Sequence, residues 1–261
     1  MQNRMTIRTK LFVPLLSLLA TFSVLATSIY SADVYAFPRE RAEDVELYAA
    51  GEIHHARIEN LWPTQSRVGF EAVNERIDKI GSMSRKERHK YIHDNPIPVI
   101  VGPGEKLYVV DHHHLARAVH DLDHSKVFVK VIENWHDLTI EEFWQRMRAR
   151  HFVYQYDTMQ GRVVSVYDLP RHIEQMKDDP YRSMAGQLRD DGFFEKKTGQ
   201  YFIEFVWAKA LRAYFRKIDF DVEKESYKGA LKLARKYAAS PAAADLPGRV
   251  ASQCKRFLSK Q

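Results

Sequence analysis

The chain has 261 residues, of which 45% are hydrophobic and 28% are charged, with a formal net charge of +6 at pH 7. This length suffices for one large core, or for one domain with an extension. The single cysteine, Cys254, excludes an internal disulfide. The basic surplus is mild and mixed with acids, so charge alone does not identify a polyanionic partner.

The first 36 residues have the pattern of an export signal. Three basic residues precede an apolar run over residues 11–26, and Val34-Tyr35-Ala36 resembles a signal-peptidase site. We expect cleavage after Ala36 and a periplasmic or secreted mature chain. An uncleaved membrane anchor is the alternative, because the run nearly reaches the roughly 18 residues that a span needs. No later segment is apolar enough, so we expect no membrane span after cleavage.

Residues 37–137 are expected to form a small domain of mixed strands and helices. Weak alternation predicts a strand over 54–61 that Pro63 ends. Apolar residues spaced by three and four predict a helix over 70–80. The further elements expected are a helix over 84–93, strands over 96–101 and 107–110 around a turn at 102–105, a helix over 112–122 and a strand over 127–132. This order predicts an α+β fold with a small mixed sheet.

Residues 138–261 are expected to form a mostly helical region packed on this domain. Thr139 and Glu142 have the spacing of a capping box, which predicts a helix start. Further helices are predicted over 202–215 and 227–239 from their apolar spacing. Aromatic residues are frequent here, so this region is expected to have a core of its own.

The most informative feature is the run Asp111-His112-His113-His114, which follows an apolar strand and opens a helical pattern. Backbone N–H groups and the helix dipole converge at such a junction, which favours anion or metal chemistry. Neighbouring side chains on a helix diverge by roughly 100°, so the three imidazoles should point in different directions. Two structural alternatives remain, in which Asp111 caps the helix or the histidines are a solvated run.

The rest of this helix offers further polar groups. Arg117 lies one turn after His113 and can hold a phosphate by two hydrogen bonds. A divalent metal ion is the candidate cofactor, with His113, His114 and His120 as candidate ligands, because imidazole and carboxylate bind zinc, manganese or iron. No strict ligand motif such as HExxH is present.

The stretch 58–132 resembles the ParB-like nuclease families of the broader ParB/sulfiredoxin fold. The residues that carry the resemblance are Leu61-Trp62-Pro63-Thr64-Gln65 with Val68-Gly69, then 96–104, then 107–118 with its Asp-His-His-His run, and later 181–185 and 205–208. The resemblance implies that the turn at 111–115 holds phosphates. His112 stands where glycine is usual and Leu115 where arginine is usual. Sulfiredoxin chemistry is excluded, because the turn has no cysteine.

We therefore expect an exported ParB-like nuclease or phosphodiesterase that acts through this turn. Asp111, His112, His113 and His114 are the predicted catalytic residues. The predicted substrate-binding residues are Arg117, Thr64, Gln65 and Arg67. Nucleic acid or a phosphorylated small molecule is the expected partner. Two alternatives stay open: a phosphate- or nucleotide-binding module without turnover, and a small-molecule phosphotransferase of the serine-kinase type.

Overall fold

The computed structural model describes residues 48–157, 159, 161–197, 201–222 and 226–259. The predicted signal peptide over 1–36 therefore lies outside the described residues, as does the beginning of the expected domain at 37–47. Within the described ranges, no helix has both the length and the apolar character to cross a membrane.

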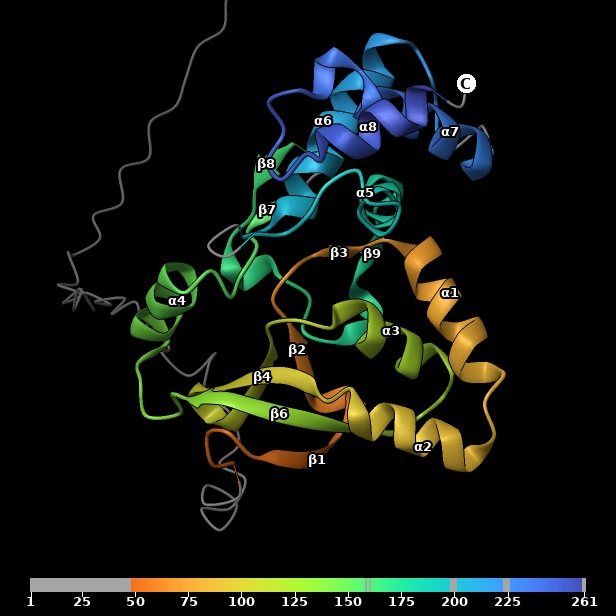
Figure 1. Ribbon diagram of the computed structural model, residues 1–261. Coiled ribbons are helices and arrows are strands. Elements are labelled where there is room, and N and C mark those ends of the chain that lie inside the picture. The colour runs from red at the N-terminus through yellow and green to blue at the C-terminus, as the bar shows by residue number, and fades with distance from the viewer. Residues whose placement is uncertain (1–47, 158, 160, 198–200, 223–225, 260–261) are drawn as a thin grey trace, which may run out of the picture. The chain divides into compact units, whose positions relative to one another are not determined.

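A five-stranded mixed sheet forms the centre of the first half of the chain (Figure 1). Its strands, in spatial order, are β1 (Ile53–Arg57), β6 (Lys126–Asn134), β4 (Ile97–Gly102), β5 (Lys106–Val109) and β2 (Leu61–Pro63). Pairing is antiparallel for β1 with β6 and for β4 with β5, and parallel for β4 with β6 and for β2 with β5.

The strand expected over 54–61 is divided in two, so that expectation was wrong in detail. Residues Ile58–Asn60 form a 3₁₀ turn between β1 and β2. Pro63 is the last residue of β2, where it pairs with Val109, so the strand ends at this proline as expected. Because β2 is an edge strand, a residue without an N–H is tolerated there.

Three helices cover one face of the sheet: α1 (Phe70–Gly81), α2 (Arg85–Asp94) and α3 (His113–Asp121). Alternate residues of β4, among them Val99 and Val101, join Val73 and Val119 of these helices in one buried cluster. Every second residue of the strand and every third or fourth residue of α1 is apolar, and these apolar side chains pack together in this core, as the sequence spacing predicts. Ser84 and Glu87 form a capping box that begins α2.

The opposite face of the sheet packs against α4 (Ile140–Ala149). Ile100 and Tyr108 point to this side and contact a cluster that includes Phe143 and Trp144. The capping box predicted from Thr139 and Glu142 is present, and it begins α4 at the expected residue.

A third buried cluster is formed by the helices α5 (Pro180–Asp190), α6 (Ile203–Lys217), α7 (Tyr227–Ala239) and α8 (Ala251–Leu258). At its centre, the rings of Trp207 and Phe194 stack at 4.5 Å. Two small sheets pair β3 (Arg67–Val68) with β9 (Lys177–Asp178) and β7 (Tyr156–Asp157) with β8 (Arg162–Val163). A mixed sheet followed by helices confirms the predicted α+β class.

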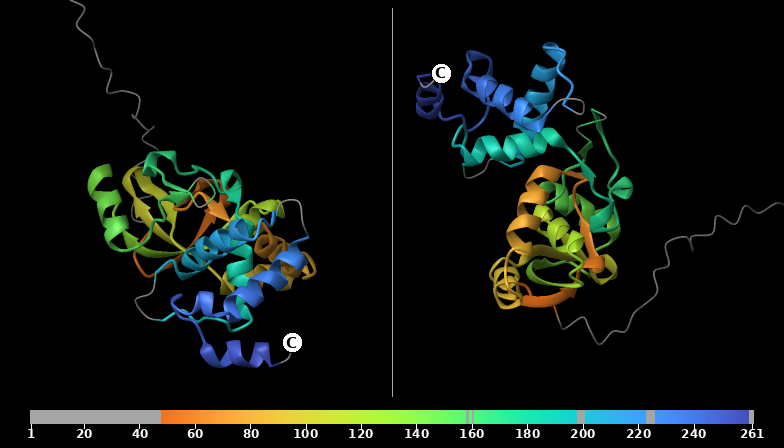
Figure 2. Two further views of the ribbon diagram at one scale, coloured as in Figure 1. Left: turned by 90° about the horizontal axis from the view of Figure 1, so that it is seen from above. Right: turned by 90° about the vertical axis from the view of Figure 1, so that its right-hand side faces the viewer.

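The segment that leads into α5 runs back across the sheet half of the chain. Ile173 and Met176 are buried in the same cluster as the sheet and α1. The pairing of β9 with β3 then sets α5 beside α1, as the right-hand view of Figure 2 shows. Through this pairing, residues more than 60 positions beyond the Asp-His-His-His run reach its neighbourhood.

Candidate functional site

A cavity of about 440 Å³ lies at the N-terminal end of α3. The Asp-His-His-His run forms part of its wall, α1, α2, α5 and the start of α6 supply much of the rest, and the loops that carry Gln65, His151 and Tyr201 complete it together with the first residue of α7. The run therefore opens onto a concave surface, as expected for a strand-to-helix junction of this kind.

The turn before α3 is held in a left-handed conformation. His112 has φ 61° and ψ 25°, the region that glycine enters most easily. The Asp111 carboxylate accepts a hydrogen bond from the His112 N–H at 2.7 Å, and the His112 Nδ1 lies 3.1 Å from the Pro96 carbonyl oxygen. Asp111 does not cap the helix, since His112 is the N-cap residue and Asp111 binds only the adjacent amide.

Three backbone amides at the start of α3 face no internal acceptor. The first helical bond runs from the Ala116 N–H to the His112 carbonyl. The N–H groups of residues 113–115 have no hydrogen-bond acceptor within the described part of the chain. Such a terminus attracts an anion, because the free amides and the helix dipole both point outward.

His113 and His114 are hydrogen-bond acceptors for two distant loops. The Thr64 N–H donates to Nε2 of His113, and the Gly69 N–H donates to Nε2 of His114, both at 3.2 Å. Burial lowers the pKa of His113 to about 4 and holds that of His114 well below its usual value. Both rings are therefore neutral at pH 7, as an acceptor nitrogen requires.

The structure brings only part of the Pro-Thr-Gln segment to the cavity. Thr64 is buried, and its hydroxyl donates to the Val109 carbonyl at 2.6 Å. Arg67 pairs with Asp157 at 2.9 Å, away from the residues that line the cavity. Of the three residues predicted to bind phosphate there, Gln65 alone lines the cavity.

Arg182 and Ser183, at the start of α5, were not among the predicted site residues. Arg182 is 8% exposed and lines the cavity, yet its Nε and Nη1 have no hydrogen-bond partner. The Ser183 hydroxyl, in the same wall, is also buried and unpartnered. Burial lowers the pKa of Arg182. The resemblance at residues 181–185 was the one signal in the sequence that pointed to this helix.

Among the other cations of the wall, Arg189 is neutralised by two neighbouring acids. Arg189 pairs with Glu204 at 2.6 Å and with Asp190 at 3.1 Å. Burial raises the pKa of Glu204, but the cations Arg182 and Arg189 outweigh it and hold that pKa below its usual value. Arg182 makes no ion pair with any described residue, so its charge is available to a ligand.

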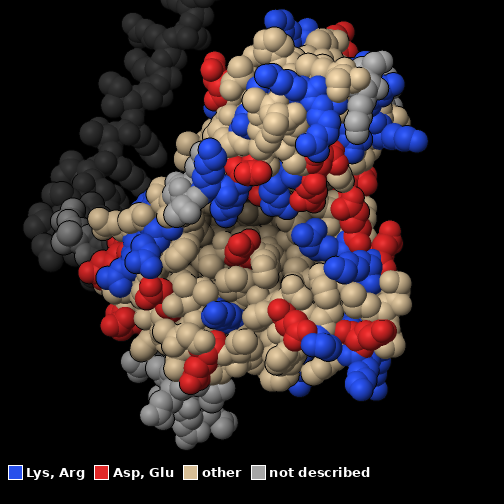
Figure 3. Space-filling view, viewed as in Figure 1, with Lys and Arg blue, Asp and Glu red and all other residues tan. Residues whose placement is uncertain are grey.

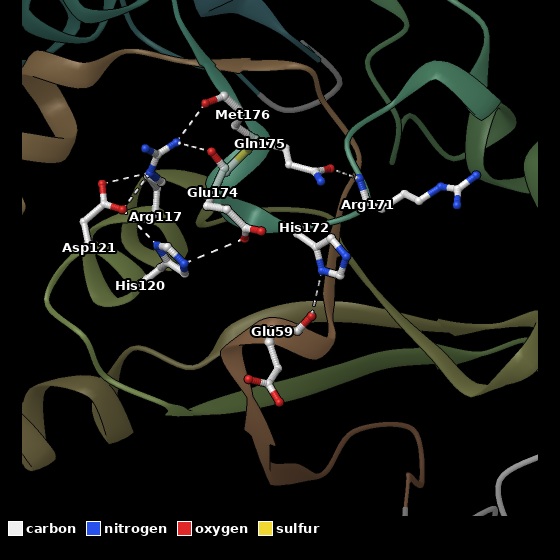
Figure 4. Close-up of polar contacts among 9 residues, drawn as sticks. All are labelled: Glu59, Arg117, His120, Asp121, Arg171, His172, Glu174, Gln175 and Met176. Carbon is white, nitrogen blue, oxygen red and sulfur yellow. Dashed lines mark hydrogen bonds and ion pairs between the residues drawn. The ribbon is translucent and has the colours of Figure 1, made fainter.

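Arg117 and His120 do not line the cavity. Figure 4 shows their contacts with Asp121 and with the segment before β9. Arg117 binds the Asp121 carboxylate at 2.8 Å, and its Nη1 donates to the carbonyls of Glu174 and Met176. His120 lies between Asp121 and Glu174. This group fastens the segment before β9 onto α3, so the structure gives Arg117 a structural contact rather than the predicted place in the site.

The described residues do not fit a metal ion held by the protein. They contain no group of three histidine, cysteine, aspartate or glutamate side chains placed to hold one. Of the three candidate ligands, His113 and His114 already use Nε2 for backbone amides, and His120 points to another part of the molecule. No metal-dependent step therefore follows from this arrangement.

Comparisons with known proteins agree with the fold. The chain is similar to the crystal structure of protein Atu1540 from Agrobacterium tumefaciens, with a TM-score of 0.68 and 34% identity. The match covers 76% of this chain and 96% of the other. No curated protein matches. A family model described as "Putative ParB-like nuclease" matches residues 54–213, a range that includes every residue lining the cavity except Tyr227. The chain belongs to this ParB-like family.

Proposed function

We propose that the cavity binds a phosphate group of a nucleic acid at the N-terminus of α3. The observation that carries this proposal is the buried, unpartnered guanidinium edge of Arg182 in the cavity wall. An unpaired buried charge is costly, and a phosphate can satisfy two of its N–H groups at once. The free amides of residues 113–115 and the Ser183 hydroxyl add donors in the same wall.

The reaction that this site supports best is phosphodiester hydrolysis, with His112 as the general base. The contact of its Nδ1 with the Pro96 carbonyl places the proton on Nδ1 and leaves Nε2 as an acceptor. Nε2 takes a proton from water, whose oxygen attacks phosphorus. The P–O bond to the leaving sugar oxygen breaks, and that oxygen takes a proton from solvent. Arg182 balances the charge that develops on the phosphate.

A second candidate is phosphate binding without turnover. It is favoured by the use of His113 and His114 as acceptors for backbone amides, which removes two of the three imidazoles from proton transfer. The same wall would then hold a nucleotide or a nucleic acid end.

The first prediction separates these candidates with two variants. Single-stranded and duplex oligonucleotides are incubated with wild type, His112→Ala and Arg182→Met, in chelator and in Mg²⁺ or Mn²⁺. Loss of the base should lower the cleavage rate by about 100-fold or more, because general base catalysis contributes on that order. Loss of the guanidinium should weaken phosphate affinity by about 10- to 100-fold, as charged hydrogen bonds of about 1.5–3 kcal/mol imply.

His136→Ala is the matched control, because His136 is exposed and outside the cavity. Intact oligonucleotides under every condition, together with Arg182-dependent phosphate binding, would reject hydrolysis in favour of binding alone. Absence of phosphate binding that depends on Arg182 would reject the site itself.

We further propose that the chain is exported and cleaved after Ala36, on the evidence of its basic and apolar N-terminal pattern. The second prediction is a mature chain that begins at Phe37 in the periplasm or the medium. Intact-mass measurement of the protein from each cell fraction tests it. A chain recovered only in the cytoplasm with its N-terminus intact would contradict export, and recovery in the membrane fraction with residues 1–36 retained would indicate an anchor.

A further inference from the structure

An exposed aromatic pair forms the rim of the cavity on the side of α6. Tyr201 is 53% exposed and lines the cavity, although a tyrosine ring normally buries most of its surface. Its ring stacks on the imidazole of His151 at 4.2 Å, with 17° between the planes. His151 lines the same cavity. The two stacked rings thus form a flat, partly solvent-exposed surface at the opening of the cavity. The proposed phosphate site at Arg182 lies in the same cavity.

A row of aromatic contacts joins this rim to the buried guanidinium. Phe202 lies against His151, with ring centroids 6.4 Å apart, and against Phe205 at 6.0 Å. The guanidinium carbon of Arg182 lies 4.1 Å from the centroid of the Phe205 ring. The exposed aromatic pair, the two phenylalanines and the Arg182 guanidinium all line the same cavity. One ligand can therefore reach both the cation and the exposed ring.

We propose that Tyr201, backed by His151, stacks an unpaired nucleobase of the ligand whose phosphate binds at Arg182. This inference rests on the proposed function and adds the class of nucleic acid to it. A base in a duplex has no free face for stacking, so the ligand is a single-stranded segment or a free nucleotide end.

Size and charge favour the same class. A volume of about 440 Å³ is in the range of small-molecule sites, which suits one nucleotide and not a duplex. Proteins that track a duplex place many basic groups along its phosphates. On the face drawn in Figure 3, basic and acidic side chains are interspersed and no broad area of one sign is seen.

The third prediction compares adenosine 5′-monophosphate with inorganic phosphate as calorimetric probes. Tyr201→Ala should weaken binding of the nucleotide by about 5- to 100-fold and leave phosphate affinity unchanged, since stacking contributes only to the base. Tyr201→Phe should bind both probes like wild type, because it keeps the ring. Tyr167→Ala is the matched control, as Tyr167 is a tyrosine of similar exposure, 58% against 53%, that does not line this cavity. Unchanged melting temperatures confirm that the variants fold.

The two proposals fail in different ways. Nucleotide affinity that is equal in wild type and Tyr201→Ala, or no tighter than that of phosphate, overturns the stacking proposal while Arg182-dependent phosphate binding still stands. Failure of both probes to bind wild type overturns the phosphate site and, with it, the stacking proposal. A preference for duplex over single-stranded oligonucleotide also overturns the stacking proposal.

Discussion

At the scale of single residues, three adjacent histidines have three different environments. His112 is exposed in a left-handed turn, whereas His113 and His114 accept backbone N–H groups from residues 49 and 45 positions earlier, respectively. In the sequence, the Pro-Thr-Gln and Asp-His-His-His runs were linked only because both carry the family resemblance; no contact between them was predicted. The bond from the Thr64 amide to His113 gives that pairing a physical reason.

The fourth prediction follows from the depressed pKa of His113. Its folded pKa of about 4 lies below the usual 6.5, so the unfolded chain binds more protons between these values. Stability should be full above about pH 6.5 and fall as the pH falls towards 4, by up to about 3 kcal/mol. Urea unfolding of wild type and His113→Gln at pH 7.5 and 4.5 measures this difference. The glutamine keeps an acceptor but does not titrate.

Carboxylates also titrate in this range, so the pH dependence of His136→Ala serves as the reference for an exposed histidine. An equal loss of stability in wild type and His113→Gln on acidification would show that His113 does not contribute to it.

The position of the cavity beside the Asp-His-His-His run could be predicted from the sequence, but the full set of residues that line it could not. The strand, the acid and the histidines are contiguous, so a local pattern locates the helix N-terminus. Helical spacing also suggested that Arg117 shares a side with His113, yet Arg117 contacts the segment before β9. Arg182 reaches the cavity only through long-range pairing, which no local period encodes.

At the scale of elements, local signals predicted most helices but not α5 or α8, and they missed one break in a strand. The capping boxes at α2 and α4 and the apolar spacing of α1 are properties of a few adjacent residues, so they are visible in the sequence. The 3₁₀ turn over Ile58–Asn60 was missed, because the alternation on either side of it reads as one strand. The end of β2 depends on its parallel partner β5, more than 40 residues later.

The start of α1 is a second feature that depends on residues far away in the sequence. Its N-cap residue, Gly69, has no side chain, so no capping signal is present in the sequence. Two residues from other elements satisfy the free amides instead: His114 accepts from Gly69, and Asp178 accepts from Phe70 at 2.8 Å. The helix terminus is therefore completed by tertiary structure.

At the scale of the whole described chain, the core is divided into three buried clusters. One lies on each face of the sheet and the third lies among α5–α8. The cavity takes walls from the sheet half and from the helical half, so its geometry depends on how closely α1 and α5 approach. Gly69 and Ser183 are in contact at that approach.

The fifth prediction tests this contact with two glycine substitutions. A Cβ at Gly69 would lie 2.3 Å from the Ser183 hydroxyl oxygen and 2.5 Å from its backbone nitrogen, so α1 and α5 must separate. Gly69→Ala should cost about 2–3 kcal/mol of unfolding free energy and weaken phosphate binding, because Arg182 and the α3 amides move apart. Gly186→Ala is the control for stability only, because Gly186 itself lines the cavity. Nothing lies within 4 Å of its Cβ, so helix propensity should add about 0.5–1 kcal/mol there. Thermal unfolding and phosphate titration measure both effects, and equal stability of the two variants would show that the approach of the helices is not tight.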